Sequence, residues 1–149
     1  MRPYQQACFS VTLALIFTLP ALAQMGIVSY WDFDEGKGDV VHDIAGNNDC
    51  TIKKDPKWGN GKRGGGLILN GSTNYLDCGN DASFNITKTL TIAVWVNIKA
   101  FGNWDGIVTK GVESGPYAMQ MWGDGSLRFS PNWGNPKGFV GKGSFNTTG

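Results

Sequence analysis

Three stretches of sequence decide the fold: SYWDFDEGKGDVVHDIAGNND at residues 29–49, GGGLILNGSTNYLDCGN at 64–80 and LTIAVWVNI at 90–98. Each combines short apolar runs with Gly, Asn and Asp, the residues that favour turns. Strand-sized runs separated by turn residues are typical of β-sandwiches and jelly rolls. The sequence therefore predicts an all-β domain.

The alternation of apolar and polar residues predicts where the strands lie. The expected strands are 27–33, 50–53, 66–70, 75–78, 89–99, 107–110, 117–122 and 127–130, and Gly-Asp-Gly at 123–125 predicts a turn between the last two. We expect 66–70 and 75–78 to form a hairpin through the turn residues at 70–74. The run 89–99 carries five aliphatic residues on one face, which predicts a central sandwich strand. Residues 55–66 contain Pro56 and several glycines, which predicts a loop.

The N-terminus has the features of a cleaved signal peptide. Arg2 precedes an apolar stretch at 9–19, Pro20 follows it, and Ala21 and Ala23 occupy the small-residue positions of a cleavage site. The stretch is shorter than the roughly 20 apolar residues that a membrane-spanning helix needs. We therefore expect residues 1–23 to be removed, residues 24–149 to form one domain, and the protein to be secreted or extracytoplasmic without a membrane span.

Charge and cysteine content limit the partners and the compartment. Without Arg2 the chain has 12 basic and 12 acidic residues, so its charge gives no reason to expect nucleic acid as a partner. Two cysteines remain after cleavage, Cys50 and Cys78, and an even number in an exported domain favours a disulfide. Two free thiols are the alternative. A zinc pair fits less well, because His42 is the only histidine.

Five motifs in order, YWDFDEGKGDVVHDIAGNND, GGGLILNGSTNYLDCGN, LTIAVWVNI, IVTKG and YAMQMWGDGSLRF, resemble the laminin-G-like jelly rolls of the concanavalin A-like lectin/glucanase superfamily. The resemblance covers residues 26–129 and implies an antiparallel jelly-roll β-sandwich. Members of the family continue with further strands that have no counterpart before Gly149. We therefore expect an incomplete jelly roll, lacking its C-terminal strands, that is either a fragment or completed by a partner.

Catalysis is not expected from these residues. Glycoside hydrolysis needs two carboxyl groups about 5–9 Å apart. The resemblance implies that a glucanase of this superfamily would carry a Glu-x-Asp-x-x-Glu strand, whereas Glu35 and Glu113 are the only glutamates and neither begins such a motif.

Calcium is the one cofactor that the sequence indicates. Asp and Asn oxygens on flexible turns are common calcium ligands, and eight such residues or Glu fall between residues 32 and 49. The resemblance implies a calcium near the rim of the sandwich, with Asp34, Glu35 and Asp43 as its predicted ligands. The alternative is that Asp and Asn only cap turns here, without a metal.

Tryptophans beside turns are the candidate ligand contacts. Trp104, Trp122 and Trp133 are the predicted ligand-binding residues, and Trp58 has a similar setting. An aromatic ring at a rim can stack on the C–H face of a sugar, whereas Trp31 and Trp95 lie within predicted strands and are expected in the core.

These features predict a non-catalytic extracytoplasmic recognition module that binds a glycan or an extracellular protein, with calcium as a possible aid. The alternative, from another class, is an accessory or truncated part of a secreted carbohydrate-active enzyme. A structural adhesion unit without a small ligand is the third reading.

Overall fold

The strands are short and all their pairings are antiparallel. The computed structural model describes residues 26–102, 104–111 and 116–130. The strands in this part of the chain are β1 (Val40–Val41), β2 (Cys50–Lys53), β3 (Lys57–Asn60), β4 (Gly65–Ile68), β5 (Tyr75–Asp77), β6 (Asp105–Lys110), β7 (Tyr117–Met121) and β8 (Leu127–Ser130), with a 3₁₀ turn η2 (Ala82–Phe84). The predicted signal peptide, residues 1–23, lies outside the described residues.

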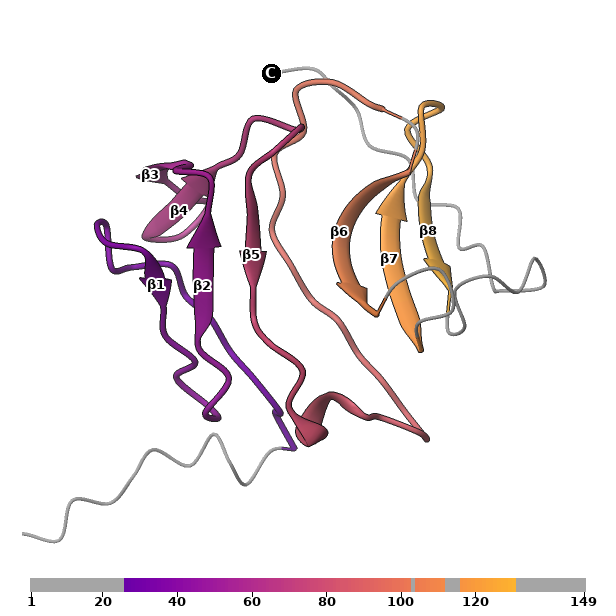
Figure 1. Ribbon diagram of the computed structural model, residues 1–149. Helices are drawn as coiled ribbons and strands as arrows, with labels where there is room; N and C mark the ends of the chain where they lie inside the picture. The colour runs from indigo at the N-terminus through magenta and orange to yellow at the C-terminus, as the bar shows by residue number, and fades with distance from the viewer. Residues whose placement is uncertain (1–25, 103, 112–115, 131–149) are drawn as a thin grey trace, which may run out of the picture.

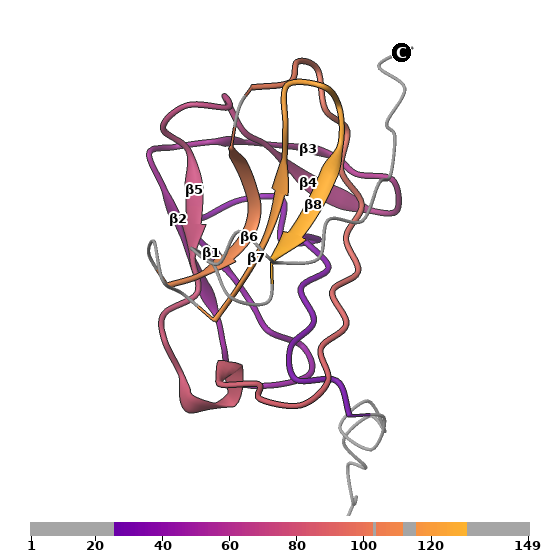
Figure 2. The same cartoon turned by 90° about the vertical axis from the view of Figure 1, so that its right-hand side faces the viewer.

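Three sheets form from these strands, in the orders β1-β2-β5, β3-β4 and β6-β7-β8. Figure 1 shows the first two sheets on one side of the molecule and β6-β7-β8 on the other. In Figure 2, seen from the second side, β6-β7-β8 lies in front of β1, β2 and β5. The strands therefore lie in two facing layers, and the all-β sandwich predicted from the sequence is confirmed.

The second layer follows the prediction closely. β6, β7 and β8 cover the expected strands at 107–110, 117–122 and 127–130 within one or two residues. β7 is the middle strand of this sheet, which explains why four of its five residues are buried. Met121 is 1% exposed and Ala118 is fully buried. The predicted turn at 123–125 joins β7 to β8, with Gly125 at a φ of 74°.

The predicted strand at 27–33 is wrong. Among the described residues this segment belongs to no sheet. The backbone of Tyr30 bonds instead to the turn beyond β1: its N–H donates to Asp43 Oδ1 (2.9 Å) and its carbonyl accepts from Ile44 N–H (2.8 Å). Phe33 has a φ of 61°, which lies outside the extended region that a strand requires.

The predicted pairing of residues 66–70 with 75–78 is also wrong, although both segments contain strands. β4 pairs with β3, and β5 pairs with β2. β3 occupies part of the predicted loop at 55–66, so the loop prediction fails there. The glycines at 64–66 let the start of β4 pack closely against the backbone at Phe33. A Cβ at Gly65 would lie 2.1 Å from the Phe33 carbonyl oxygen, which leaves room only for glycine.

The predicted central strand at 89–99 forms no sheet in the described part of the chain, and no hydrogen bond links it to another described residue. Its alternation is nevertheless visible in the burial. Leu90, Ile92, Val96 and Ile98 are half-buried, and most residues between them are exposed. Trp95 is 72% exposed, so its predicted place in the core is wrong.

A disulfide joins Cys50 and Cys78, as predicted. Thr51 pairs with Asp77 across β2 and β5, and this register brings the preceding Cys50 next to the following Cys78. The bond closes a loop of 28 residues in sequence separation and stabilises the fold by roughly 3.5 kcal/mol through lost freedom of the unfolded chain. Within the residues described, no helix has the length and apolarity to cross a membrane.

Candidate functional site

Two of the three predicted ligand-binding tryptophans lie side by side at one end of the second layer. Trp104 directly precedes β6 and Trp122 directly follows β7. Asp105 and Met121 are partners in the antiparallel ladder, so the residues just beyond them also lie opposite each other. The ladder thus explains why residues 18 positions apart in the sequence meet. Trp133, the third, lies outside the described residues.

The two indole rings are in contact, with centroids 4.3 Å apart and planes tilted by 52°. The Arg128 guanidinium lies 3.6 Å from the centroid of the Trp122 ring, a cation–π contact. Trp122 is half-buried between these contacts, whereas Trp104 is 57% exposed. Trp104 is therefore the ring presented to solvent, and Trp122 supports it. We refer to Trp104, Trp122 and Arg128 together as the tryptophan platform.

The backbone around the platform is held by local hydrogen bonds. Trp122 N–H donates to the Ser126 carbonyl (3.0 Å), and Gly125 N–H donates to the Trp122 carbonyl (2.8 Å). On the other loop, Gly102 N–H donates to Asp105 Oδ2 (2.7 Å). Trp104 itself has a φ of 70°. A positive φ is costly for a bulky residue and is often associated with functional sites.

Arg128 is the member of the platform that the sequence reasoning missed. It pairs with Gln120 across β7 and β8, and Gln120 lies two residues before Trp122. Residues two apart share a face of a strand, so Arg128 and Trp122 are diagonal neighbours. The turn residues at 123–125 were the available signal, because the hairpin they predict brings these two residues together.

Asp43, a predicted calcium ligand, has its carboxylate surrounded by backbone donors. Oδ1 accepts from the N–H groups of Tyr30, Ala45 and Gly46, and Oδ2 accepts from Asn48 N–H, at 2.9–3.1 Å. Asp43 is 7% exposed. Burial raises the pKa of this carboxyl, but the hydrogen bonds from Tyr30, Gly46 and Asn48 outweigh burial and hold the pKa below its ordinary value. Asp43 therefore organises the turn.

The other two predicted calcium ligands have different partners. Asp34 Oδ1 accepts from Gly65 N–H at the start of β4, and Glu35 Oε1 accepts from His42 N–H (2.8 Å). The second oxygen of Glu35 is buried without a hydrogen-bond partner in the part of the chain that the structure describes. Across these same residues, no group of three or more His, Cys, Asp or Glu side chains is arranged to hold a metal ion. Calcium at Asp34, Glu35 and Asp43 stays a prediction.

His42 and Asp49 form an exposed ion pair beside this turn, with 2.9 Å between His42 Nδ1 and Asp49 Oδ2. The hydrogen bond to Asp49 and its negative charge raise the pKa of His42 above its ordinary value. Asp49 Oδ1 also accepts from Asp43 N–H (2.8 Å), so the pair is attached to the same turn.

Two further tryptophans are used inside the fold. Trp58 Nε1 donates to the Gly38 carbonyl (3.1 Å), and Trp31 Nε1 donates to the Asn48 carbonyl (2.9 Å). Both are half-buried. Each ring therefore attaches one segment of the first layer to another, which is the structural use expected for Trp31.

The two facing layers of antiparallel strands are the architecture of a β-sandwich domain. Comparison with family models agrees: residues 70–149 match the laminin-G-like family of the concanavalin A-like lectin/glucanases superfamily. The match spans more than half of the chain, so the chain belongs to this family. Its domains are often carbohydrate- or protein-binding modules and are typically not catalytic. The comparisons with curated proteins and with solved structures each gave no match.

Proposed function

We propose that this protein is an extracytoplasmic recognition module that binds glycans on the tryptophan platform. The single observation that carries the proposal is Trp104, a ring 57% exposed that rests on Trp122, which in turn contacts Arg128. Trp and Tyr rings present an apolar surface with a polar edge, which suits the C–H faces and hydroxyl groups of sugars. The disulfide and the family support a location outside the cytoplasm.

The platform is suited to binding because it is held in place before a ligand arrives. The ladder between β6 and β7 fixes the two tryptophans, and the hydrogen bonds of both loops fix the backbone beside them. A preformed site binds more tightly than one that must be ordered by its ligand. Asp105 follows Trp104 directly, and its carboxylate accepts from Gly102 N–H, so it helps to hold the loop that carries the exposed ring.

A glycan array tests this proposal with the wild-type protein and a Trp104→Ala variant. We expect binding to a subset of glycans and a loss of about tenfold or more in affinity for the variant, or about 1.4 kcal/mol. Trp95→Ala is the matched control, because Trp95 is even more exposed but lies outside the platform. Absence of binding to every glycan, or an equal loss in both variants, contradicts the proposal. Repeating the array with a calcium chelator tests the predicted calcium.

A further inference from the structure

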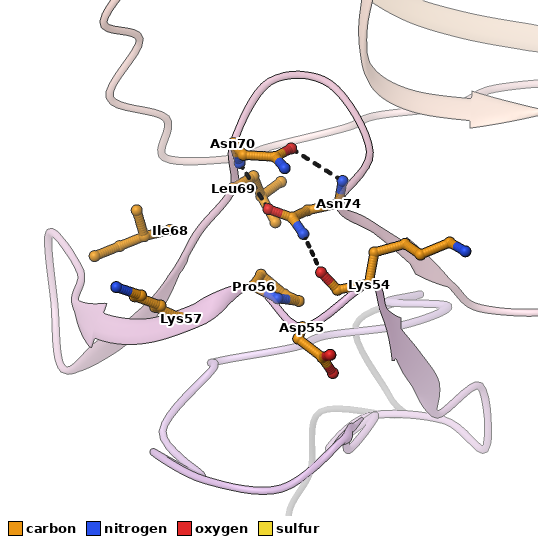
Figure 3. Close-up of a pocket in the computed structure, with 8 residues that line it drawn as sticks. All are labelled: Lys54, Asp55, Pro56, Lys57, Ile68, Leu69, Asn70 and Asn74. Carbon is orange, nitrogen blue, oxygen red and sulfur yellow. Dashed lines mark hydrogen bonds between the residues drawn. The ribbon is translucent and has the colours of Figure 1, made fainter.

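A separate pocket lies in the first layer, between the turn that joins β2 to β3 and the loop that joins β4 to β5 (Figure 3). Its volume is about 330 Å³, at the lower end of the range for small-molecule sites. Pro56, Lys57, Ile68, Leu69, Asn70 and Asn74 line it, and Lys54 and Asp55 complete it. The pocket is large enough for one sugar residue rather than a chain.

One wall of the pocket is apolar and open to solvent. Ile68 is 60% exposed and Leu69 is 46% exposed, and Pro56 of the β2–β3 turn also lines the pocket (Figure 3). Covering exposed aliphatic surface with the apolar face of a ligand is favourable. Two adjacent residues of this kind in a pocket therefore offer a surface for the C–H face of a small ligand.

The opposite wall is a rigid pair of amides. Asn70 Oδ1 accepts from the N–H groups of Ser72, Thr73 and Asn74 at 2.9–3.1 Å. Asn74 Oδ1 accepts from Asn70 N–H (2.8 Å), and Asn74 Nδ2 donates to the Lys54 carbonyl. These bonds tie the β4–β5 loop to the β2–β3 turn. The pocket is thus formed by its own side chains before any ligand binds.

Lys57 supplies a positive charge beside the apolar wall. It is the cross-strand partner of Ile68, so both side chains lie on the same face of the β3–β4 hairpin. Figure 3 places their sticks next to each other at one end of the pocket, whereas the Lys54 side chain extends from the other end. In the described ranges, neither lysine is in an ion pair. Lys57 is therefore available to bind an anion.

We infer that this pocket binds a sugar carboxylate: the pyranose ring of a uronic acid against Ile68 and Leu69, with its carboxylate at Lys57. The inference rests on the proposed glycan-binding function and adds a second subsite. Figures 1 and 2 both place the loops of the pocket and those of the tryptophan platform toward the same end of the molecule. One acidic glycan can therefore bind both the pocket and the tryptophan platform from that end.

The test uses D-glucuronate and D-glucose, which differ at C6 by a carboxylate. Each is titrated into the ¹⁵N-labelled protein, and the amide shifts are followed by NMR. We expect glucuronate to shift the amides of residues 54–57 and 68–74 and to bind about tenfold more tightly than glucose, because a charge-assisted hydrogen bond is gained. Equal binding of the two sugars, or no shift in the pocket, overturns the inference.

Three lysine variants make the test specific. Lys57→Gln should weaken glucuronate binding by about tenfold and leave glucose binding unchanged. Lys54→Gln should have a smaller effect, since its side chain points away from the apolar wall, and Lys62→Gln should have none, since this exposed residue does not line the pocket. Equal losses in all three variants indicate general charge attraction and overturn the inference.

A Trp104→Ala variant separates this inference from the proposed function. Glucuronate shifts in the pocket should persist in it. If the shifts fall instead on residues 102–105 and 122–128 and vanish in the variant, the pocket inference fails while the tryptophan platform stands. If pocket binding persists but no array glycan depends on Trp104, the pocket stands and the proposed function fails.

Discussion

The two layers of this protein are held together by different interactions. In the first layer, residues 26–85, the strands are two to four residues long and the buried set includes Asp43 and Asn48 beside Val41 and Cys50. Side-chain hydrogen bonds to backbone groups and one disulfide connect its segments. In the second layer, β6 and β7 form the longest ladder among the described strands, and burial is concentrated on the middle strand β7.

This difference teaches that, in a chain rich in Gly, Asn and Asp, hydrogen bonds from side chains to the backbone can take the place of an apolar core between sheets. One side chain that satisfies several buried backbone groups then matters as much as a large apolar residue, because each buried N–H without a partner is costly. The first layer should therefore be sensitive to polar substitutions and acid, and the second layer to apolar truncation. The following experiments test that contrast.

Asp43→Ala should have the largest effect. It leaves four backbone N–H groups without their acceptor, so we expect the free energy of unfolding to fall by about 4 kcal/mol, measured by urea denaturation. Hydrogen exchange should rise in the first layer before the second. Asp77→Ala is the control, because among the described residues exposed Asp77 accepts only from Gly79 N–H, and it should cost less than about 1 kcal/mol. Similar losses in the two variants contradict the contrast.

Met121→Ala tests the second layer. Met121 is 1% exposed, and truncation of a fully buried Met leaves a cavity, so we expect a loss of about 3 kcal/mol with faster exchange in β6-β7-β8. Met119→Ala on the same strand is the matched control. Met119 is only half-buried, and its truncation should cost about half as much or less. If hydrogen exchange rises equally in both layers, the two layers unfold as one unit. Their different sensitivity to polar and apolar substitutions is then contradicted.

The ion pair of His42 and Asp49 should give the smallest effect. Because the pKa of His42 is raised in the folded state, the pair stabilises the fold below the ordinary His pKa of 6.5, and this contribution is lost as the pH rises through the raised value. The pair is exposed, so the change in stability should be small. NMR titration of the His42 ring should give a pKa above 6.5 that returns toward it in Asp49→Asn. If the His42 pKa is unchanged in the variant, Asp49 is not the cause of the raised pKa.

Local patterns in the sequence predicted the features that depend on near neighbours. β2, β6, β7 and β8 were identified from short apolar runs, and the turn at 123–125 from its glycines. The disulfide followed from cysteine number and is confirmed. Trp104 and Trp122 were singled out because both stand beside turns, although only the ladder between β6 and β7 shows that they meet.

The errors arose where distant residues decide the structure. Alternation at 27–33 predicted a strand, but Tyr30 N–H donates to Asp43 and its carbonyl accepts from Ile44 N–H, which fixes that backbone to a turn 13 residues later. The turn residues at 70–74 favoured a local hairpin, whereas β4 and β5 each pair with an earlier strand. Glycines at 64–66 were read as loop residues, although they admit the close packing of β4 against Phe33. Pairing choices of this kind carry no local signature.

The bond between Cys50 and Cys78 has a consequence for survival among proteases. It encloses the whole β3–β4 hairpin and the lining of the pocket within one covalent ring. Lys62 and Arg63, which join the two strands of the hairpin, are exposed and are the residues after which trypsin-like enzymes cleave. A cut there opens the ring but releases no fragment, and the ladder between β3 and β4 can hold the new ends together. Only cleavage combined with reduction separates the pieces.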